Sequence, residues 1–201
     1  MSAIRRSFLV CSFLLLQIGC SSAQDTLLLL NGHQLIADSI RLEGFDVAAF
    51  LKDRKKPKQI NSYRVFSIRH ADGQEEVVYQ KDITDPLDFS EEEMRMFIAG
   101  EQDADRYYKN NFNKGLSFAV GFGSSLAAIY GLVIPPLYST VVGSFTPNMD
   151  RMKVSDESLR SNQVFCEGYQ STVRRKKIKN SLLSGLAGFA AGFIFFNLVL
   201  D

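Results

Sequence analysis

The sequence lacks the common signatures of an enzyme active site. Its 201 residues include two histidines and no tryptophan, and no HExxH, CxxC, GxSxG or phosphate-binding loop occurs. His33 lies beside a predicted turn and His70 at a predicted strand end, where surface positions are expected. Acidic residues gather in one predicted helix, and such a charged face is usually solvated: Glu91, Glu92, Glu93, Glu101, Asp103 and Asp105. We therefore predict a protein that is not an enzyme and has no metal or cofactor site.

Charge of one sign is not in excess. The formal net charge is +1, whereas general nucleic-acid binders usually carry a clear basic excess. We expect no nucleic-acid partner.

Cysteine is too scarce for a disulfide-stapled scaffold. Cys11 and Cys20 lie in a segment that has the pattern of a signal peptide and would be removed or lipidated, so only Cys166 remains as a free thiol. One cysteine cannot form an internal disulfide.

The signal peptide is predicted over residues 1–23. Arg5 and Arg6 precede an apolar core over 8–18, and small residues over 21–23 offer a cleavage site before Gln24. An alternative is lipidation of Cys20, although Gln17 stands where that motif expects a branched apolar residue. An uncleaved anchor is disfavoured because the core is short.

Charged residues are missing from two long stretches, 115–149 and 180–200. Each is long enough to cross a bilayer, which takes about 20 helical residues. We predict transmembrane helix 1 over 116–134 and transmembrane helix 2 over 180–200. Pro135 and Pro136 should break or end the first helix, with 137–145 as an interfacial or re-entrant continuation. The alternative is a span that is kinked at the prolines and extends to Phe145.

Glycine is frequent in both stretches. The spacing of Gly188 and Gly192 lets helix backbones approach closely. Such faces indicate either packing of the two spans within one chain or a homo-oligomer, and neither span carries the ionisable group usual in a transporter. The predicted helix-packing residues are Gly121, Gly123, Gly131, Gly185, Gly188 and Gly192.

Residues 24–82 have the pattern of a small β domain. Asn31-Gly32 is a strong hairpin signal, and a second turn is predicted at Ala71-Asp72-Gly73. Runs over 26–30, 35–42, 47–51, 63–70 and 76–80 predict five short strands. Such strands, joined by tight turns, suggest a small barrel or a strongly curved sheet.

Two further helices are predicted outside the spans. A connecting helix is predicted over 88–112, because Ser90 and Glu93 have the spacing of a capping box. Another is predicted within 156–179, with Phe165, Tyr169 and Val173 on one face. Both contain an F-x-x-G-x-Q pattern, at 97–102 and 165–170, which suggests a repeated unit of helix and span.

A basic run precedes the second span: Arg174, Arg175, Lys176, Lys177 and Lys179. Clustered cations beside a span set membrane topology and attract anionic lipid headgroups. With the leader, this run predicts an inner-membrane protein whose N-terminal domain is periplasmic. Residues 135–179 would then form a cytoplasmic loop and a basic amphipathic helix.

The chain resembles a group of exported two-span membrane proteins of Bacteroidetes that have no assigned function. The segments that carry the resemblance are DTLLLLNG at 25–32, VFSI and ADG within 65–73, GEQDA through YY at 100–108, VIPP at 133–136, and GY through RRKK at 168–177. The resemblance implies an envelope location and an extracytoplasmic β domain, and it supplies no activity.

These patterns together predict an α+β membrane protein with a small β domain, a connecting helix and a Gly-rich two-helix hairpin. We expect a non-enzymatic binding or structural module of the cell envelope, with membrane lipids and an envelope protein or a second copy as partners. The alternative is a small oligomeric channel or transport-accessory protein assembled through the glycine-rich faces.

Overall fold

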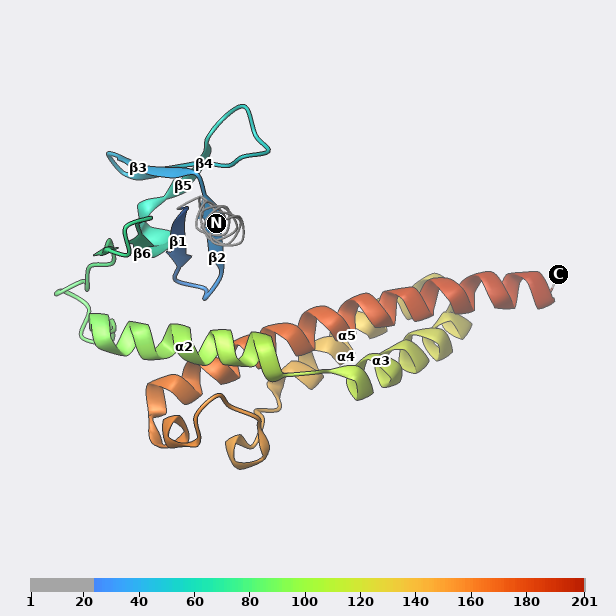
Figure 1. Ribbon diagram of the computed structural model, residues 1–201. Coiled ribbons are helices and arrows are strands. Elements are labelled where there is room, and N and C mark those ends of the chain that lie inside the picture. The colour runs from blue at the N-terminus through green and yellow to red at the C-terminus, as the bar shows by residue number, and fades with distance from the viewer. Residues whose placement is uncertain (1–23, 201) are drawn as a thin grey trace, which may run out of the picture. The chain divides into compact units, whose positions relative to one another are not determined.

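The computed structural model describes residues 24–200 (Figure 1). The predicted signal peptide and the choice between cleavage and lipidation of Cys20 lie outside these residues. The chain forms two compact units. We call residues up to Tyr79, without 30–32, the β unit, and residues from Gln80 onward, with 30–32, the helical unit.

The β unit holds two antiparallel sheets within the described residues. One has the strand order β2-β1-β6-β7 and the other β3-β4-β5. The strands are β1 (Asp25–Leu29), β2 (Gln34–Ala37), β3 (Ser39–Glu43), β4 (Asp46–Phe50), β5 (Lys58–Asn61), β6 (Val65–Arg69) and β7 (Glu75–Val77). The hairpin predicted at Asn31-Gly32 is confirmed, since β1 pairs with β2 across it.

The predicted barrel is wrong, because the two sheets of the β unit are not joined into a closed cylinder in the described chain. The run predicted as one strand over 35–42 divides at Asp38, and its halves enter different sheets. The backbone N–H of Ile40 donates to the Asp25 carboxylate at 3.0 Å, which fixes this bend. A shared apolar core then holds the sheets together: Leu27, Ala37, Ile40, Val47, Ala49, Ile60, Val65 and Ile68.

Strand β6 is buried on both faces. Val65, Phe66, Ser67 and Ile68 are all buried. Phe66 packs on the ring of Tyr79, and the Ser67 hydroxyl donates to the Glu75 carboxylate at 2.6 Å. Side chains on both faces of β6 are therefore fixed by contacts within the β unit.

The helical unit begins with α2 (Glu91–Tyr107), and the predicted capping box is confirmed. The Ser90 hydroxyl accepts from the Glu93 backbone N–H at 3.3 Å, and the Ser90 N–H donates to the Glu93 carboxylate at 2.8 Å. The helix ends at Tyr107, before the end predicted at residue 112.

The first uncharged stretch contains a break, which lies before the predicted position at Pro135 and Pro136. The chain continues as α3 (Asn111–Ser124), the 3-10 segment η2 (Ser125–Val133) and α4 (Ile134–Ser144). The helical path is interrupted at Ala127 and Ala128. Pro135 and Pro136 do not end a helix but stand in the first turn of α4, where a missing N–H costs nothing.

The last helix, α5 (Gln163–Leu200), follows the short turns η3 (Met149–Arg151) and η4 (Glu157–Ser161). Phe165, Tyr169 and Val173 are fully buried on one face of α5, as the sequence predicted, and pack with Ala104 of α2. The Tyr169 hydroxyl donates to the Lys153 carbonyl at 3.1 Å, which ties down the loop before α5.

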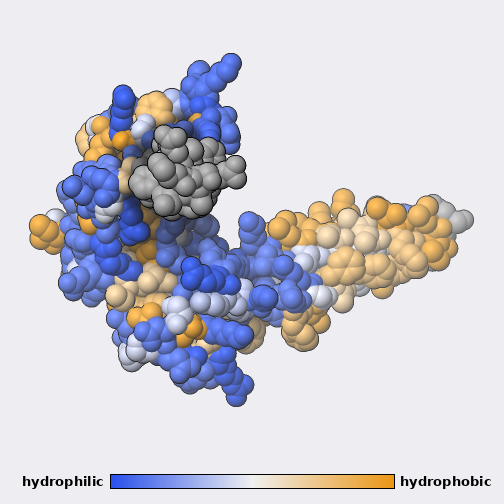
Figure 2. Space-filling view, in the orientation of Figure 1, coloured by the Kyte–Doolittle hydropathy of each residue, from blue (hydrophilic) through white to orange (hydrophobic). Residues whose placement is uncertain are grey.

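Two helical stretches, Asn111–Ser144 and Gln163–Val199, are long and apolar enough to cross a membrane. Figure 2 shows hydrophobic residues covering the end of the helical unit that the second half of α5 forms with α3 and α4. The chain is therefore an α+β protein with an apolar helical segment of membrane-spanning length.

Candidate functional site

The basic run lies where α5 passes from its polar to its apolar half. We call Arg174, Arg175, Lys176, Lys177 and Lys179 the basic collar. Its position on one uninterrupted helix fixes the cations at one level of the helical unit, directly before the uncharged residues 180–200.

Two lysines of the basic collar are bound to the ends of neighbouring helices. Lys176 Nζ donates to the carbonyls of Ala104 and Asp105, at 2.9 and 2.8 Å, in the last turn of α2. It also pairs with the Asp105 carboxylate at 3.0 Å. Lys177 Nζ donates to the carbonyl of Phe145, the residue that caps α4, at 2.7 Å. Cations at these carbonyls compensate the negative helix ends.

Arg175 is bound to a buried carboxylate of α2. Glu101 is 2% exposed, and its Oε1 accepts from Arg175 Nη2 at 3.3 Å and from the Thr172 hydroxyl at 3.4 Å. The Oε2 atom has no hydrogen-bond partner among the described residues. Burial raises the pKa of Glu101 above its usual value, and the nearby Arg175 guanidinium opposes that rise.

The prediction that the acidic residues of this helix form a solvated face is therefore wrong for two of them. Glu101 and Asp103 are buried. Asp103 accepts from the backbone N–H and the hydroxyl of Ser155, at 2.7 and 2.8 Å. Sequence reasoning missed Glu101, although it stands inside the F-x-x-G-x-Q pattern that marks the contact of α2 with α5.

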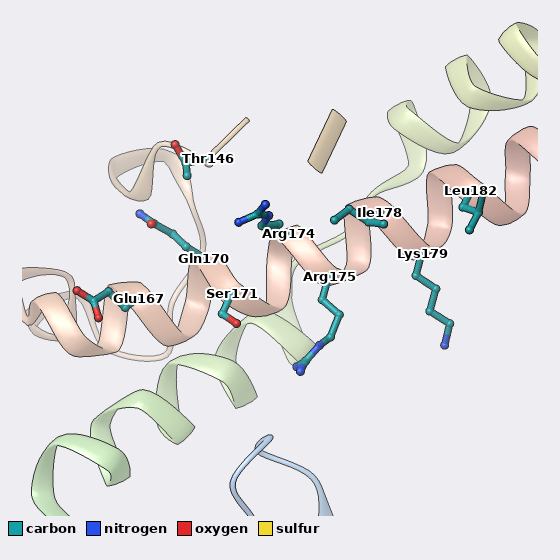
Figure 3. Close-up of a pocket in the computed structure, with 9 residues that line it drawn as sticks. All are labelled: Thr146, Glu167, Gln170, Ser171, Arg174, Arg175, Ile178, Lys179 and Leu182. Atoms are coloured by element: carbon teal, nitrogen blue, oxygen red, sulfur yellow. The ribbon is translucent and has the colours of Figure 1, made fainter. Parts of the chain in front are cut away.

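The remaining cations of the basic collar, Arg174 and Lys179, are exposed and make no hydrogen bond or ion pair within residues 24–200. They line an open groove of about 690 Å³, which also includes the apolar side chains of Ile178 and Leu182. Figure 3 shows Arg174 on one side of α5 and Arg175 and Lys179 on the other. The cations thus surround the helix instead of converging on one point, an arrangement that suits a layer of anionic groups better than a single small anion.

Five of the six predicted helix-packing glycines contact the chain's own backbone or side chains. A Cβ atom added at Gly121 would overlap the backbone of Gly185, and one at Gly188 would overlap that of Phe118. Gly131 faces Ser124, Gly185 faces Pro135, and Gly192 faces Phe122 and Ser125. Gly123 faces open space. The close approaches that these glycines permit are therefore made between α3, η2, α4 and α5 of one chain.

Two ionic contacts of His70 involve none of the residues of this site. His70 lies in the β unit, with Nε2 at 3.4 Å from the Glu76 carboxylate and Nδ1 at 3.8 Å from that of Asp25. Across residues 24–200, no group of three or more His, Cys, Asp or Glu side chains is placed to hold a metal ion.

The comparisons with known proteins returned no match: no family model, no curated protein and no solved structure is similar to this chain.

Proposed function

We propose that this protein is a non-enzymatic, membrane-anchored module of the bacterial cell envelope, related to the exported proteins that it resembles. The observation that supports anchoring best is the basic collar placed directly before an apolar helix of membrane-spanning length. The leader pattern supports an inner-membrane location with the β unit on the periplasmic side.

The β unit offers a surface suited to a protein partner. Phe45 and Tyr63 are 76% and 77% exposed. Their backbone segments meet at one end of the three-stranded sheet, since the N–H of Ser62, the residue before Tyr63, donates to the Phe45 carbonyl at 3.0 Å. Exposed aromatic residues are enriched in the parts of interfaces that contribute most binding energy. We define these two residues as the aromatic tip and assign it to binding an envelope protein.

Co-purification from gently solubilised membranes tests this role. The double variant Phe45→Ala/Tyr63→Ala should lose the partner, whereas Arg64→Ala, an exposed neighbour, should keep it. Recovery of the unaltered protein alone in several mild detergents would count against a stable partner. Retention of the partner by the double variant would exclude the aromatic tip as the contact.

The basic collar has a second role in this proposal, which is contact with anionic lipid headgroups. A cation close to an anionic membrane surface contributes about 1 kcal/mol. Arg174→Gln/Lys179→Gln should therefore weaken association of the purified protein with vesicles that contain phosphatidylglycerol. Lys55→Gln/Lys56→Gln removes the same charge from the β unit and is the matched control. Equal weakening by both pairs would indicate a general charge effect and no headgroup contact at the collar.

The channel hypothesis receives no support from the helical unit. It requires glycine faces that are free to meet another copy, and the faces around Gly121, Gly188 and Gly192 already contact the same chain.

A further inference from the structure

The path of the first uncharged stretch can be followed by its contacts along α5. Near the collar, Gly143 of α4 contacts Ile178. Two turns further along α5, Gly185 contacts Pro135 of α4. Helix α4 therefore runs antiparallel to α5, because its residue numbers fall as those of α5 rise.

Helix α3 runs along α5 in the same direction as α5, whereas α4 runs in the opposite direction. Gly188 of α5 contacts Phe118, and Gly192 contacts Phe122 and Ser125. The residue numbers of both helices rise together, so α3 runs parallel to α5. The reversal between α3 and α4 falls at Ala127 and Ala128, where the backbone is not helical. Figure 1 shows α3 and α4 lying along the same half of α5.

Two adjacent lysines place the entry and the exit of this stretch at one level. Lys176 binds the carbonyls of Ala104 and Asp105, close to the end of α2, and Lys177 binds the carbonyl of Phe145 after α4. The chain therefore leaves the collar level after α2 and returns to that level after α4. The first uncharged stretch therefore does not end at the opposite end of the apolar part of α5, as a single membrane span would.

The helix lengths agree with such a return. With the residues of η2 that continue each helix as far as Ala127 and Ala128, the two legs, 111–126 and 129–144, have 16 residues each, or about 24 Å at 1.5 Å per residue. The hydrocarbon core of a bilayer is about 30 Å thick, so neither helix crosses it alone. Beyond the collar, α5 continues for some 20 residues, or about 30 Å, and can cross.

The last turn of α3 carries buried serines that bond back to the helix just before the reversal, whereas Ala127 and Ala128 at the reversal itself are exposed. The Ser124 hydroxyl donates to the Gly121 carbonyl at 2.8 Å, and the Ser125 hydroxyl donates to the Phe122 carbonyl at 2.6 Å. Both serines are buried, and no residue from Gly115 to Met149 is charged.

We infer that α3, η2 and α4 form a re-entrant hairpin, and that α5 alone crosses the bilayer. The β unit, the basic collar and the loop between α4 and α5 then share one aqueous side, and the C-terminus lies on the other. This inference rests on the proposed membrane anchoring. It replaces the topology expected from charge, in which a first span separates the β unit from a cytoplasmic basic loop.

Cysteine labelling in spheroplasts tests the hairpin with single-cysteine variants in a Cys166→Ser background. Ala71→Cys reports on the β unit, Ser158→Cys on the loop before α5, and a cysteine appended after Asp201 on the C-terminus. All three are treated with a membrane-impermeant maleimide before and after permeabilisation. Retention of each variant in alkali-washed membranes shows beforehand that the protein is inserted, and the background without added cysteine should not react.

Labelling of Ala71→Cys and Ser158→Cys in intact spheroplasts, with the C-terminal cysteine reacting only after permeabilisation, is the expected result. Labelling of Ala71→Cys and the C-terminal cysteine together, with Ser158→Cys protected, would overturn the hairpin and restore two spans. If Ala71→Cys and Ser158→Cys both react only after permeabilisation, the hairpin stands and the periplasmic location of the proposed function is wrong. Absence from washed membranes would refute the anchoring itself.

A second measurement needs no substitution in the structured region. Trypsin added to intact spheroplasts should cut the exposed loop at Arg151 or Lys153 in the unaltered protein. Protection of this loop while the β unit is digested would contradict the shared side.

Discussion

Gly100 and Gly168 pack reciprocally, each against the backbone of the other's helix. A Cβ atom on Gly100 would overlap the carbonyl oxygen of Phe165, and one on Gly168 would overlap that of Phe97. The two glycines occupy equivalent places in the two F-x-x-G-x-Q segments, so the repeated pattern marks both sides of one helix crossing. Glycine is required there because the backbones of α2 and α5 are too close for any side chain.

Gly168→Ala should lower the stability of the protein. The added methyl group must displace backbone, and such overpacking typically costs about 1–3 kcal/mol. Thermal unfolding of the detergent-solubilised protein, followed by circular dichroism, measures the loss as a lower midpoint. Gly123→Ala is the matched control, because a Cβ there meets open space. An unchanged midpoint for Gly168→Ala would refute the close crossing.

Ser90→Ala should weaken the start of α2. The hydroxyl of Ser90 accepts from the Glu93 N–H, and loss of such a cap costs about 1 kcal/mol. The bonds from Ser90 also hold the pKa of Glu93 below its usual value. The same unfolding measurement applies. Ser171→Ala, at an exposed position within α5, should change the midpoint little, and equal effects of both variants would argue against the capping box.

Local features of this chain were readable from sequence, since they depend on neighbours along the chain. The capping box at Ser90, the hairpin at Asn31-Gly32 and the buried face of Phe165, Tyr169 and Val173 follow from spacing alone. Each of these features depends on residues close together in the sequence, and contacts with distant segments do not alter it.

Features set by contacts between distant segments were not readable. Pro135 is compatible with the end of one helix or the first turn of the next, and its contact with Gly185 is invisible in the sequence. The burial of Glu101 likewise depends on Thr172 and Arg175, more than 70 positions away. The basic collar was found from its charges, but charge did not reveal that Lys176 and Lys177 bind helix ends.

Lys177→Met should destabilise the helical unit while preserving most of the side chain's volume. The ammonium group donates to the Phe145 carbonyl at 2.7 Å, and a hydrogen bond of this kind contributes about 1 kcal/mol. A lower unfolding midpoint is expected in detergent. Lys179→Met removes a cation that has no partner in the described chain and should leave the midpoint nearly unchanged. If Lys179→Met lowered the unfolding midpoint more than Lys177→Met does, the division of the collar into bound and free cations would be wrong.

Glu101 should make the stability of the protein fall as the pH rises. Its pKa in the folded state is raised by burial, so the folded state binds the proton more tightly than the unfolded state does. The stability that protonation contributes is fully present below the unfolded value of about 4.3. It is lost as the pH rises through the higher folded pKa.

Glu101→Gln should flatten this dependence, since an amide does not titrate. Unfolding midpoints measured from about pH 4 upward, at constant ionic strength, give the comparison. Glu92→Gln, on the exposed face of the same helix, should keep the slope of the unaltered protein. The same downward slope in Glu101→Gln would show that another group carries the pH dependence.

Ala128→Gly should stabilise the reversal between α3 and α4. Ala128 has φ = 50° and ψ = −136°, a conformation that a side chain disfavours and that glycine adopts readily. Relief of this strain is worth about 1 kcal/mol, so the unfolding midpoint in detergent should rise.

Ala127, at φ = −83° in the same turn, gains no such relief, and Ala127→Gly should leave stability unchanged or lower it. A rise in the unfolding midpoint for Ala128→Gly alone would indicate a turn that requires a positive φ at this position. A continuous helix through this stretch has no such requirement. Destabilisation by Ala128→Gly would instead show that the backbone there is helical and that the reversal is absent.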